Sequence, residues 1–142
     1  MSRERPPDSV VLDREYDGTT STLRAVRHDV VGWLRGHTTD ADLEDRLALV
    51  VSELATNAIQ ASPGTAYALR VSLLDGSVVM TLTSSSGLTA PPPRETWGPV
   101  TAMAPNGRGL LIVDRMTDGV DVEETLGGKI MVTATFRASS FD

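Results

Sequence analysis

The chain has 142 residues, 40% of them hydrophobic and 23% charged, which is typical of one globular domain long enough to bury a core. Its net charge of -6 argues against a nucleic-acid surface, and the absence of cysteine excludes a disulfide framework and a thiolate metal site. No run approaches the roughly 18 apolar residues of a membrane span, and the start MSRERPPDS lacks the apolar core of a signal peptide, so we expect a cytoplasmic protein.

The first part of the chain predicts a tail, a strand and a helix. Residues 1–9 are polar and contain prolines, so we expect a flexible tail followed by a single domain over residues 10–142. The run VVLDREY (10–16) has the modest alternation of a strand. Hydroxyl residues suited to an N-cap then precede a helix that ends at Gly36. Its apolar residues recur at helical spacing, namely Leu23, Val26, Val30, Trp33 and Leu34.

A second helix and a hairpin are predicted next. The run TTDADLEDRLALVVSELATNAIQAS has helical periodicity, with Thr39 or Asp40 as its cap and with Pro63 and Gly64 after its end. Two alternating runs, AYALRVSLL and SVVMTLTSS, flank the sequence DGS, which is a turn typical of antiparallel hairpins.

The last part of the chain predicts a lid, a short helix and a second hairpin. Residues 87–107 lack clear periodicity, and so long an irregular segment in a compact domain indicates a functional lid. The run RGLLIVDRMTD is typical of a short helix, and the C-terminal run is typical of a hairpin with Gly127 and Gly128 at its turn. Hairpin-linked strands with helices collected on one face predict the α/β class, as a two-layer sandwich with a mixed, mostly antiparallel sheet.

Two polar residues lie beside the apolar stripe of the second helix. Glu53 and Asn57 are one turn apart, next to buried-type positions such as Leu54 and Ala58. In one interpretation they are structural, at the edge of the stripe, with Asn57 hydrogen-bonded to a neighbouring loop. In the other, the Asn57 oxygen is a ligand for Mg²⁺ and the Glu53 carboxylate is a general base.

A glycine motif, NGRGLLIV, spans residues 106–113. Gly107 and Gly109 flank Arg108 where an irregular segment becomes a helix, and glycines at such a place let backbone N–H groups approach a phosphate. The motif is neither a Walker loop nor a dinucleotide fingerprint. A loop-to-helix joint that needs conformational freedom is the alternative interpretation.

The order of these features resembles a known superfamily. A helix with Glu-x-x-x-Asn, a hairpin, a lid, a Gly-x-Gly-Leu helix start and a Gly-Gly-Lys hairpin resemble the GHKL (Bergerat-fold) ATPases, which include histidine kinases. The runs LALVVSELATNAIQAS and GRGLLIVDRMTDGVDVEETLGGKIMVTATF are most similar to the bacterial anti-sigma-factor serine kinases, and the likeness covers about residues 10–137. No segment ahead of the domain has room for the phosphoacceptor helices of a histidine kinase, which disfavours that branch.

The resemblance implies roles for matched positions. Glu53 falls on the catalytic base, and Asn57 falls on the ligand that ties Mg²⁺ to the triphosphate of ATP. Thr133 or Thr135 matches a hydroxyl near the adenine. The lid hinge and the phosphate-contacting helix start are matched by Gly107, Arg108, Gly109 and Leu110. The implied partners are a sigma factor and an anti-anti-sigma protein phosphorylated on serine or threonine, with no direct nucleic acid or membrane contact, and family members commonly form homodimers.

One family feature is absent. The strand before the lid normally ends in Asp-x-Gly-x-Gly, whose aspartate binds the adenine amino group, but this chain has TLTSSSGLTAPPP. Taking Gly87 as the last glycine puts Thr83 at that position, and taking Gly87 as the middle one puts Ser85 there. A hydroxyl accepts the hydrogen bond without charge, so we expect weakened or altered nucleotide recognition. The alternative is a non-catalytic regulator of the same fold that acts by protein contact.

Overall fold

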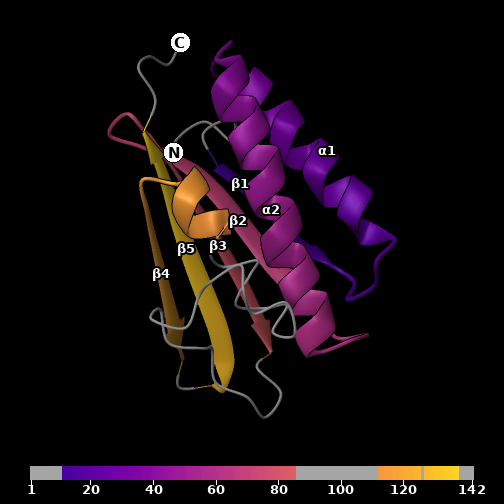
Figure 1. The fold of residues 1–142 in the computed structure, drawn as a ribbon. Coiled ribbons are helices and arrows are strands. Elements are labelled where there is room, and N and C mark those ends of the chain that lie inside the picture. Colours follow the sequence, from indigo (N-terminus) through magenta and orange to yellow (C-terminus); the bar gives the residue numbers. More distant parts are fainter. Residues whose placement is uncertain (1–10, 86–111, 126, 138–142) are drawn as a thin grey trace, which may run out of the picture.

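The computed structural model describes residues 11–85, 112–125 and 127–137. Gly87, the predicted lid and the motif from Gly107 to Leu110 lie outside the described residues. A short helix covers residues 112–116. The other elements, drawn in Figure 1, are β1 (Val11–Tyr16), α1 (Thr22–Arg35), α2 (Ala41–Ala61), β2 (Tyr67–Leu74), β3 (Ser77–Ser85), β4 (Gly119–Glu124) and β5 (Lys129–Arg137).

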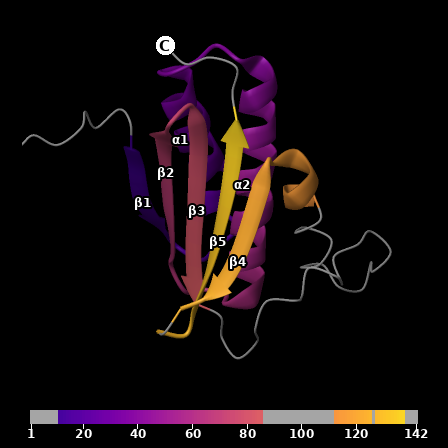
Figure 2. The same ribbon diagram turned by 90° about the vertical axis from the view of Figure 1, so that its left-hand side faces the viewer.

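The strands form one five-stranded sheet, and both long helices cover the same face of it (Figure 2). The order is β1-β2-β3-β5-β4, and all four pairings in the described part of the chain are antiparallel. The predicted two-layer α/β sandwich is therefore confirmed. None of the helices in the described residues is long and apolar enough to span a membrane.

The core lies between α2 and the middle of the sheet. Strand β3 alternates up to Leu82, with Val78, Met80 and Leu82 buried, so one face carries the apolar side chains. The same alternation on β2 and β5 continues this apolar surface across the sheet. The buried strand residues are Tyr67, Leu69, Val71, Val78, Met80, Leu82, Val132, Ala134 and Phe136.

The helix ends agree only in part with the predictions. The Asp40 side chain caps α2 by accepting a hydrogen bond from the Leu43 amide at 3.1 Å, as predicted. The expected hydroxyl cap on α1 is wrong, because Ser21 has helical backbone angles and makes no side-chain cap bond. Instead the Thr22 hydroxyl donates to the Thr19 carbonyl at 2.8 Å, within the preceding turn. Gly36 follows the end of α1 as expected.

Both predicted hairpin turns form. Asp75 and Gly76 have φ of 50° and 79°, and positive φ at both central residues defines the type I′ turn that suits the twist of two paired strands. The β4–β5 connection has Gly128 at φ 76°, with its amide donating to the Thr125 carbonyl. These left-handed positions explain the glycines that the sequence places there.

Candidate functional site

The two flanks of α2 have different neighbours. On one flank, Glu44 receives two hydrogen bonds from Arg35 of α1, and the Ser52 hydroxyl accepts one from Arg27 of α1. Glu53 and Asn57 are half-buried and lie on the other flank, because helical geometry places them well around the axis from Glu44 and Ser52. They are therefore turned away from α1.

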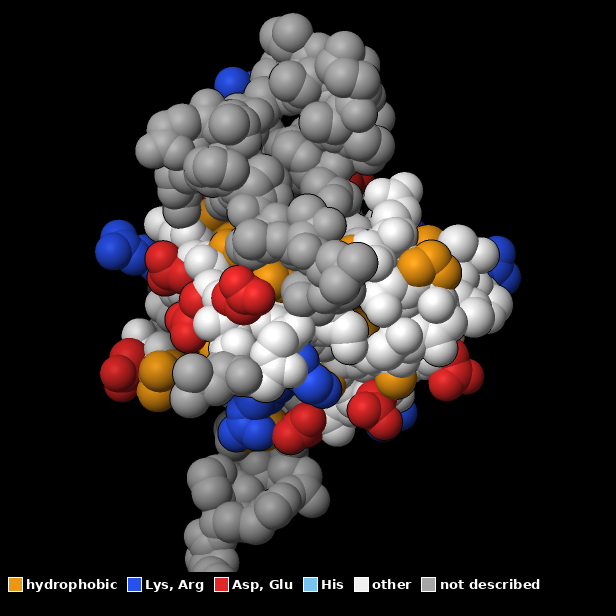
Figure 3. All heavy atoms as spheres, turned by 90° about the horizontal axis from the view of Figure 1, so that it is seen from below, with side chains coloured by type: hydrophobic (Ala, Val, Ile, Leu, Met, Phe, Trp, Pro, Cys, Tyr) orange, Lys and Arg blue, Asp and Glu red, His pale blue; other side chains and the backbone are white. Residues whose placement is uncertain are grey.

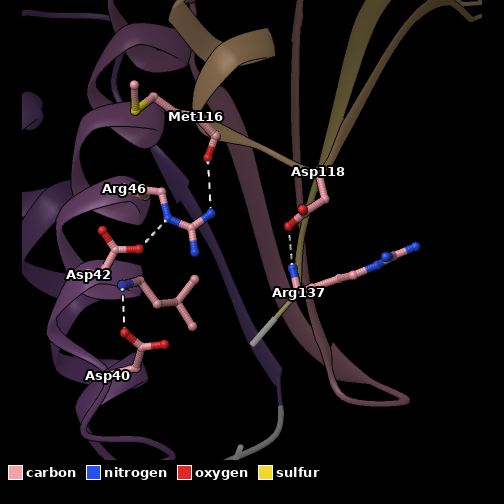
Figure 4. Close-up of polar contacts among 7 residues, drawn as sticks. Asp40, Asp42, Arg46, Met116, Asp118 and Arg137 are labelled. Carbon is pink, nitrogen blue, oxygen red and sulfur yellow. Dashed lines mark hydrogen bonds and ion pairs between the residues drawn. The ribbon is translucent and has the colours of Figure 1, made fainter. Parts of the chain in front are cut away.

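Arg46 identifies what the second flank of α2 faces. It precedes Glu53 by two turns, so the two side chains lie on the same side of the helix. Its Nη1 donates to the Met116 carbonyl at 3.3 Å (Figure 4). Its guanidinium lies 6.0 Å from the ring centroid of Phe136 on β5. The flank with Glu53 and Asn57 thus faces the β5 half of the sheet and the segment that carries the short helix.

The C-terminal half of α2, the end of β3 and the start of β5 lie at the same end of the molecule (Figure 1). Register confirms the strand part of this arrangement, since Ser85 is paired with Lys129. Figure 3 views this end directly, where hydrophobic side chains reach the surface between charged side chains of both signs. Glu53 and Asn57, the expected base and metal ligand, therefore lie on α2 near the end of β3. The family aspartate is expected at that end of β3.

Strand alternation places Ser84 on a different face of the sheet from Thr83 and Ser85, the two positions considered for the missing aspartate. Because Val78, Met80 and Leu82 face the helices, Thr83 and Ser85 belong to the opposite face and Ser84 to the helix side. Ser84 is paired with Ile130, which packs against the core and so marks the same side. Neither alignment considered from the sequence used Ser84. Its place on the helix side follows from Leu82, because every second side chain of a strand points to the same face.

Thr133 is also on the sheet face opposite the helices. Its hydroxyl is 3.4 Å from that of Thr81 on β3, and the flanking residues Val132 and Ala134 are the buried ones. Thr135 follows the same alternation. The structure does not bring either threonine together with Glu53 and Asn57, and the adenine contact from this strand stays a prediction.

Two residues outside this arrangement have structural positions. The Asp118 carboxylate accepts a 2.6 Å hydrogen bond from the Arg137 amide at the start of β4 (Figure 4). His28 is exposed on α1. Among the residues that the structure describes, no three His, Cys, Asp or Glu side chains gather as a metal cluster.

The family is established by comparison with known proteins. The model of the histidine kinase-like ATPase domain matches residues 17–136, which is most of the chain. The chain belongs to this family. Membership implies an ATP-binding domain and confirms the resemblance that the sequence motifs indicated. Among curated proteins, none matches the sequence.

A solved structure with the same fold is that of the RsbU and RsbW domains of Rv1364c from Mycobacterium tuberculosis. Its TM-score is 0.67 at 18% sequence identity, over 89% of this chain and 32% of that one. At this identity the likeness is one of fold. The chain spans about a third of the length of that protein.

Proposed function

We propose that this protein is an anti-sigma factor with serine/threonine-protein kinase activity. It binds ATP with Mg²⁺, phosphorylates an anti-anti-sigma partner and sequesters a sigma factor in the cytoplasm. The observation that carries the proposal is the pair Glu53 and Asn57, half-buried on the flank of α2 that is turned from α1 toward β5 and the short helix. The fold likeness to a structure containing an RsbW domain supports the regulatory role.

The donor set fits a magnesium ion held partly by the nucleotide. Asn57 offers one neutral oxygen, and Mg²⁺ in such sites takes few protein ligands and completes its shell with phosphate and water oxygens. When bound, the ion offsets negative charge on the triphosphate. Gly107, Arg108, Gly109 and Leu110 are assigned to the phosphates by the family motif.

Glu53 has the chemistry of the base in phosphoryl transfer. The hydroxyl oxygen of the partner attacks the γ-phosphorus, the bond to the β–γ bridging oxygen breaks, and ADP leaves. The hydroxyl proton passes to the Glu53 carboxylate, which must be ionised to accept it. Its position beside Asn57, one helical turn away, puts proton acceptor and metal ligand on one surface.

A glutamine substitution separates chemistry from binding. Glu53→Gln keeps the shape of the side chain but accepts no proton, so we expect ATP affinity within about threefold of wild type and transfer slowed by about 10²–10⁴. ATP binding is measured by calorimetry with Mg²⁺, and transfer by γ-phosphate labelling of a co-purified anti-anti-sigma protein. Asp45→Asn on the exposed side of α2 is the matched control. A Glu53→Gln protein that transfers phosphate at the wild-type rate contradicts the mechanism.

The second candidate function is a regulator that has lost nucleotide binding. The observation that favours it is the end of β3, where the sequence has Thr83, Ser84 and Ser85 and no carboxylate. This candidate predicts no detectable heat from wild-type protein at millimolar ATP and Mg²⁺. Micromolar affinity in the same titration contradicts it.

A further inference from the structure

The short helix over residues 112–116 depends on its surroundings. A short helical segment gains most of its stability from tertiary packing rather than from its own hydrogen bonds. Val113 is fully buried in the core and Met116 packs against it. The Thr117 hydroxyl closes the end by donating to the Val113 carbonyl at 2.8 Å. Arg46 adds a polar contact between this helix and the body of the protein.

Arg46 holds the C-terminal end of this helix. Its Nη1 donates to the Met116 carbonyl at 3.3 Å, and a helix C-terminus with its partial negative charge favours a cation. The arginine side chain is only 25% exposed, so water competes for this bond less than at an open surface. Guanidinium geometry lets the remaining N–H groups serve other partners at the same time.

Two further contacts fix the orientation of the guanidinium. Nε of Arg46 donates to the Asp42 carboxylate at 3.0 Å, one turn earlier on α2, and the guanidinium lies 6.0 Å from the Phe136 ring centroid. Asp42 is 79% exposed, so the ion pair adds little stability by itself. Its contribution is to fix the orientation of the Arg46 guanidinium. The Arg46 side chain on α2 thus contacts the short helix, as Figure 4 shows, and also the Phe136 ring on β5.

We infer that Arg46 is a positioning residue for the nucleotide site. It holds the short helix against the flank of α2 that carries Glu53 and Asn57. In the sequence this helical segment comes directly after the motif from Gly107 to Leu110 and Leu111, and the family motif assigns Gly107 to Leu110 to the phosphates. The inference rests on the proposed function, because it assigns Arg46 to the phosphate end of the same site.

Arg46→Met tests this role. Methionine retains an unbranched side chain that packs over Phe136 but removes every donor, so the Met116 carbonyl loses the arginine bond. We expect ATP affinity to fall about tenfold while adenosine affinity stays within about twofold, because adenosine has no phosphate. Amide exchange at Asp118, whose N–H donates to the Thr135 carbonyl at 2.8 Å, should quicken about tenfold without nucleotide.

Two further variants complete the series. Arg35→Met breaks a comparable arginine contact on the α1 flank of α2 and should leave ATP affinity and Asp118 exchange unchanged. Arg46→Lys keeps the charge and one reachable partner at a time, so it should give an intermediate ATP affinity. Circular dichroism shows whether Arg46→Met folds. If it does not fold, the ATP affinity of Arg46→Lys tests the positioning role instead.

The outcomes separate this inference from the proposed function. Wild-type binding of ATP with an unchanged affinity in Arg46→Met overturns the positioning role, and so does an equal loss for ATP and adenosine. Wild-type protein that does not bind ATP overturns the proposed function, and Asp118 exchange then decides whether Arg46 holds the helix. Selective loss of ATP affinity in Arg46→Met, with Arg35→Met unaffected, supports the inference.

Discussion

Replacing Ser84 with aspartate should restore the carboxylate that this chain lacks. Ser84 continues the helix-facing row of β3 after Leu82 and is paired with Ile130 of β5. An aspartate there would present its oxygens on the side of the sheet that α2 covers. If the adenine of ATP occupies this end of the site, the carboxylate accepts a hydrogen bond from its amino group.

The size of the effect follows from the two kinds of hydrogen bond. A bond to a charged group contributes about 1.5–3 kcal/mol, and a neutral one about 0.5–1.5 kcal/mol. The difference of about 1.4 kcal/mol corresponds to an ATP dissociation constant about tenfold lower. GTP has a carbonyl in place of the amino group, so the new carboxylate should repel it and raise the preference for ATP by more than tenfold.

The neighbours of Ser84 provide matched controls. Thr83→Asp and Ser85→Asp add the same negative charge, but strand alternation puts them on the opposite face. All three variants are titrated with ATP and GTP in the calorimeter, and the controls should lower ATP affinity slightly through charge repulsion. Tighter ATP binding by Thr83→Asp or Ser85→Asp refutes the assignment of Ser84 to the nucleotide side of β3. Unchanged ATP binding in all three refutes an adenine site at the end of this strand.

Two stability predictions test other parts of the fold. Gly18→Ala should lower the free energy of unfolding in urea by about 3 kcal/mol, because a Cβ there would lie 2.7 Å from the Thr65 nitrogen. Gly32→Ala has open space on α1 and should raise the free energy of unfolding by about 0.5–1 kcal/mol. Equal effects of the two variants contradict the described packing around Gly18. The pKa of Tyr16 is raised by burial and by its 2.7 Å hydrogen bond to Asp29, so the folded protein holds this proton more tightly than the unfolded chain. Stability should therefore be retained below pH about 10 and fall above it, and Tyr16→Phe should flatten that fall in unfolding curves at pH 8 and 11. The buried Tyr67, whose pKa is also raised by burial, leaves some alkaline dependence in the variant.

The fold was largely predictable because its signals are local. Asp40, the Asp75-Gly76 turn and the alternation of β5 each act within a few residues, and their side chains or backbone angles decide the structure there. The prediction of a hydroxyl N-cap on α1 was wrong for a reason that is also local. Several hydroxyls compete at Thr19 to Thr22, and the bonds that Thr22 makes with its own turn prevail over a cap.

The candidate site was harder to predict because it depends on which face each side chain takes. Glu53 and Asn57 were found because their spacing on a helix is independent of the sheet. Thr83, Ser85 and Thr133 were chosen by motif alignment, in which a shift of one residue is small. In a strand the same shift reverses the face, so a motif match that is uncertain by one residue does not decide which face of the sheet the side chain takes.

In the proposed function, the two ends of the nucleotide site rest on different elements of the fold. The proposed metal and base end comprises Glu53 and Asn57, which lie on the same flank of α2 as Arg46, the residue that contacts the short helix. The proposed base-recognition end comprises the last residues of β3, where Ser84 lies on the helix side of the sheet. Because Ser84 belongs to a strand and the other three to a helix, a substitution on β3 changes nucleotide affinity and base selectivity while leaving the geometry of proton transfer intact. Glu53→Gln in a Ser84→Asp background should therefore bind ATP as tightly as Ser84→Asp alone and still fail to transfer phosphate.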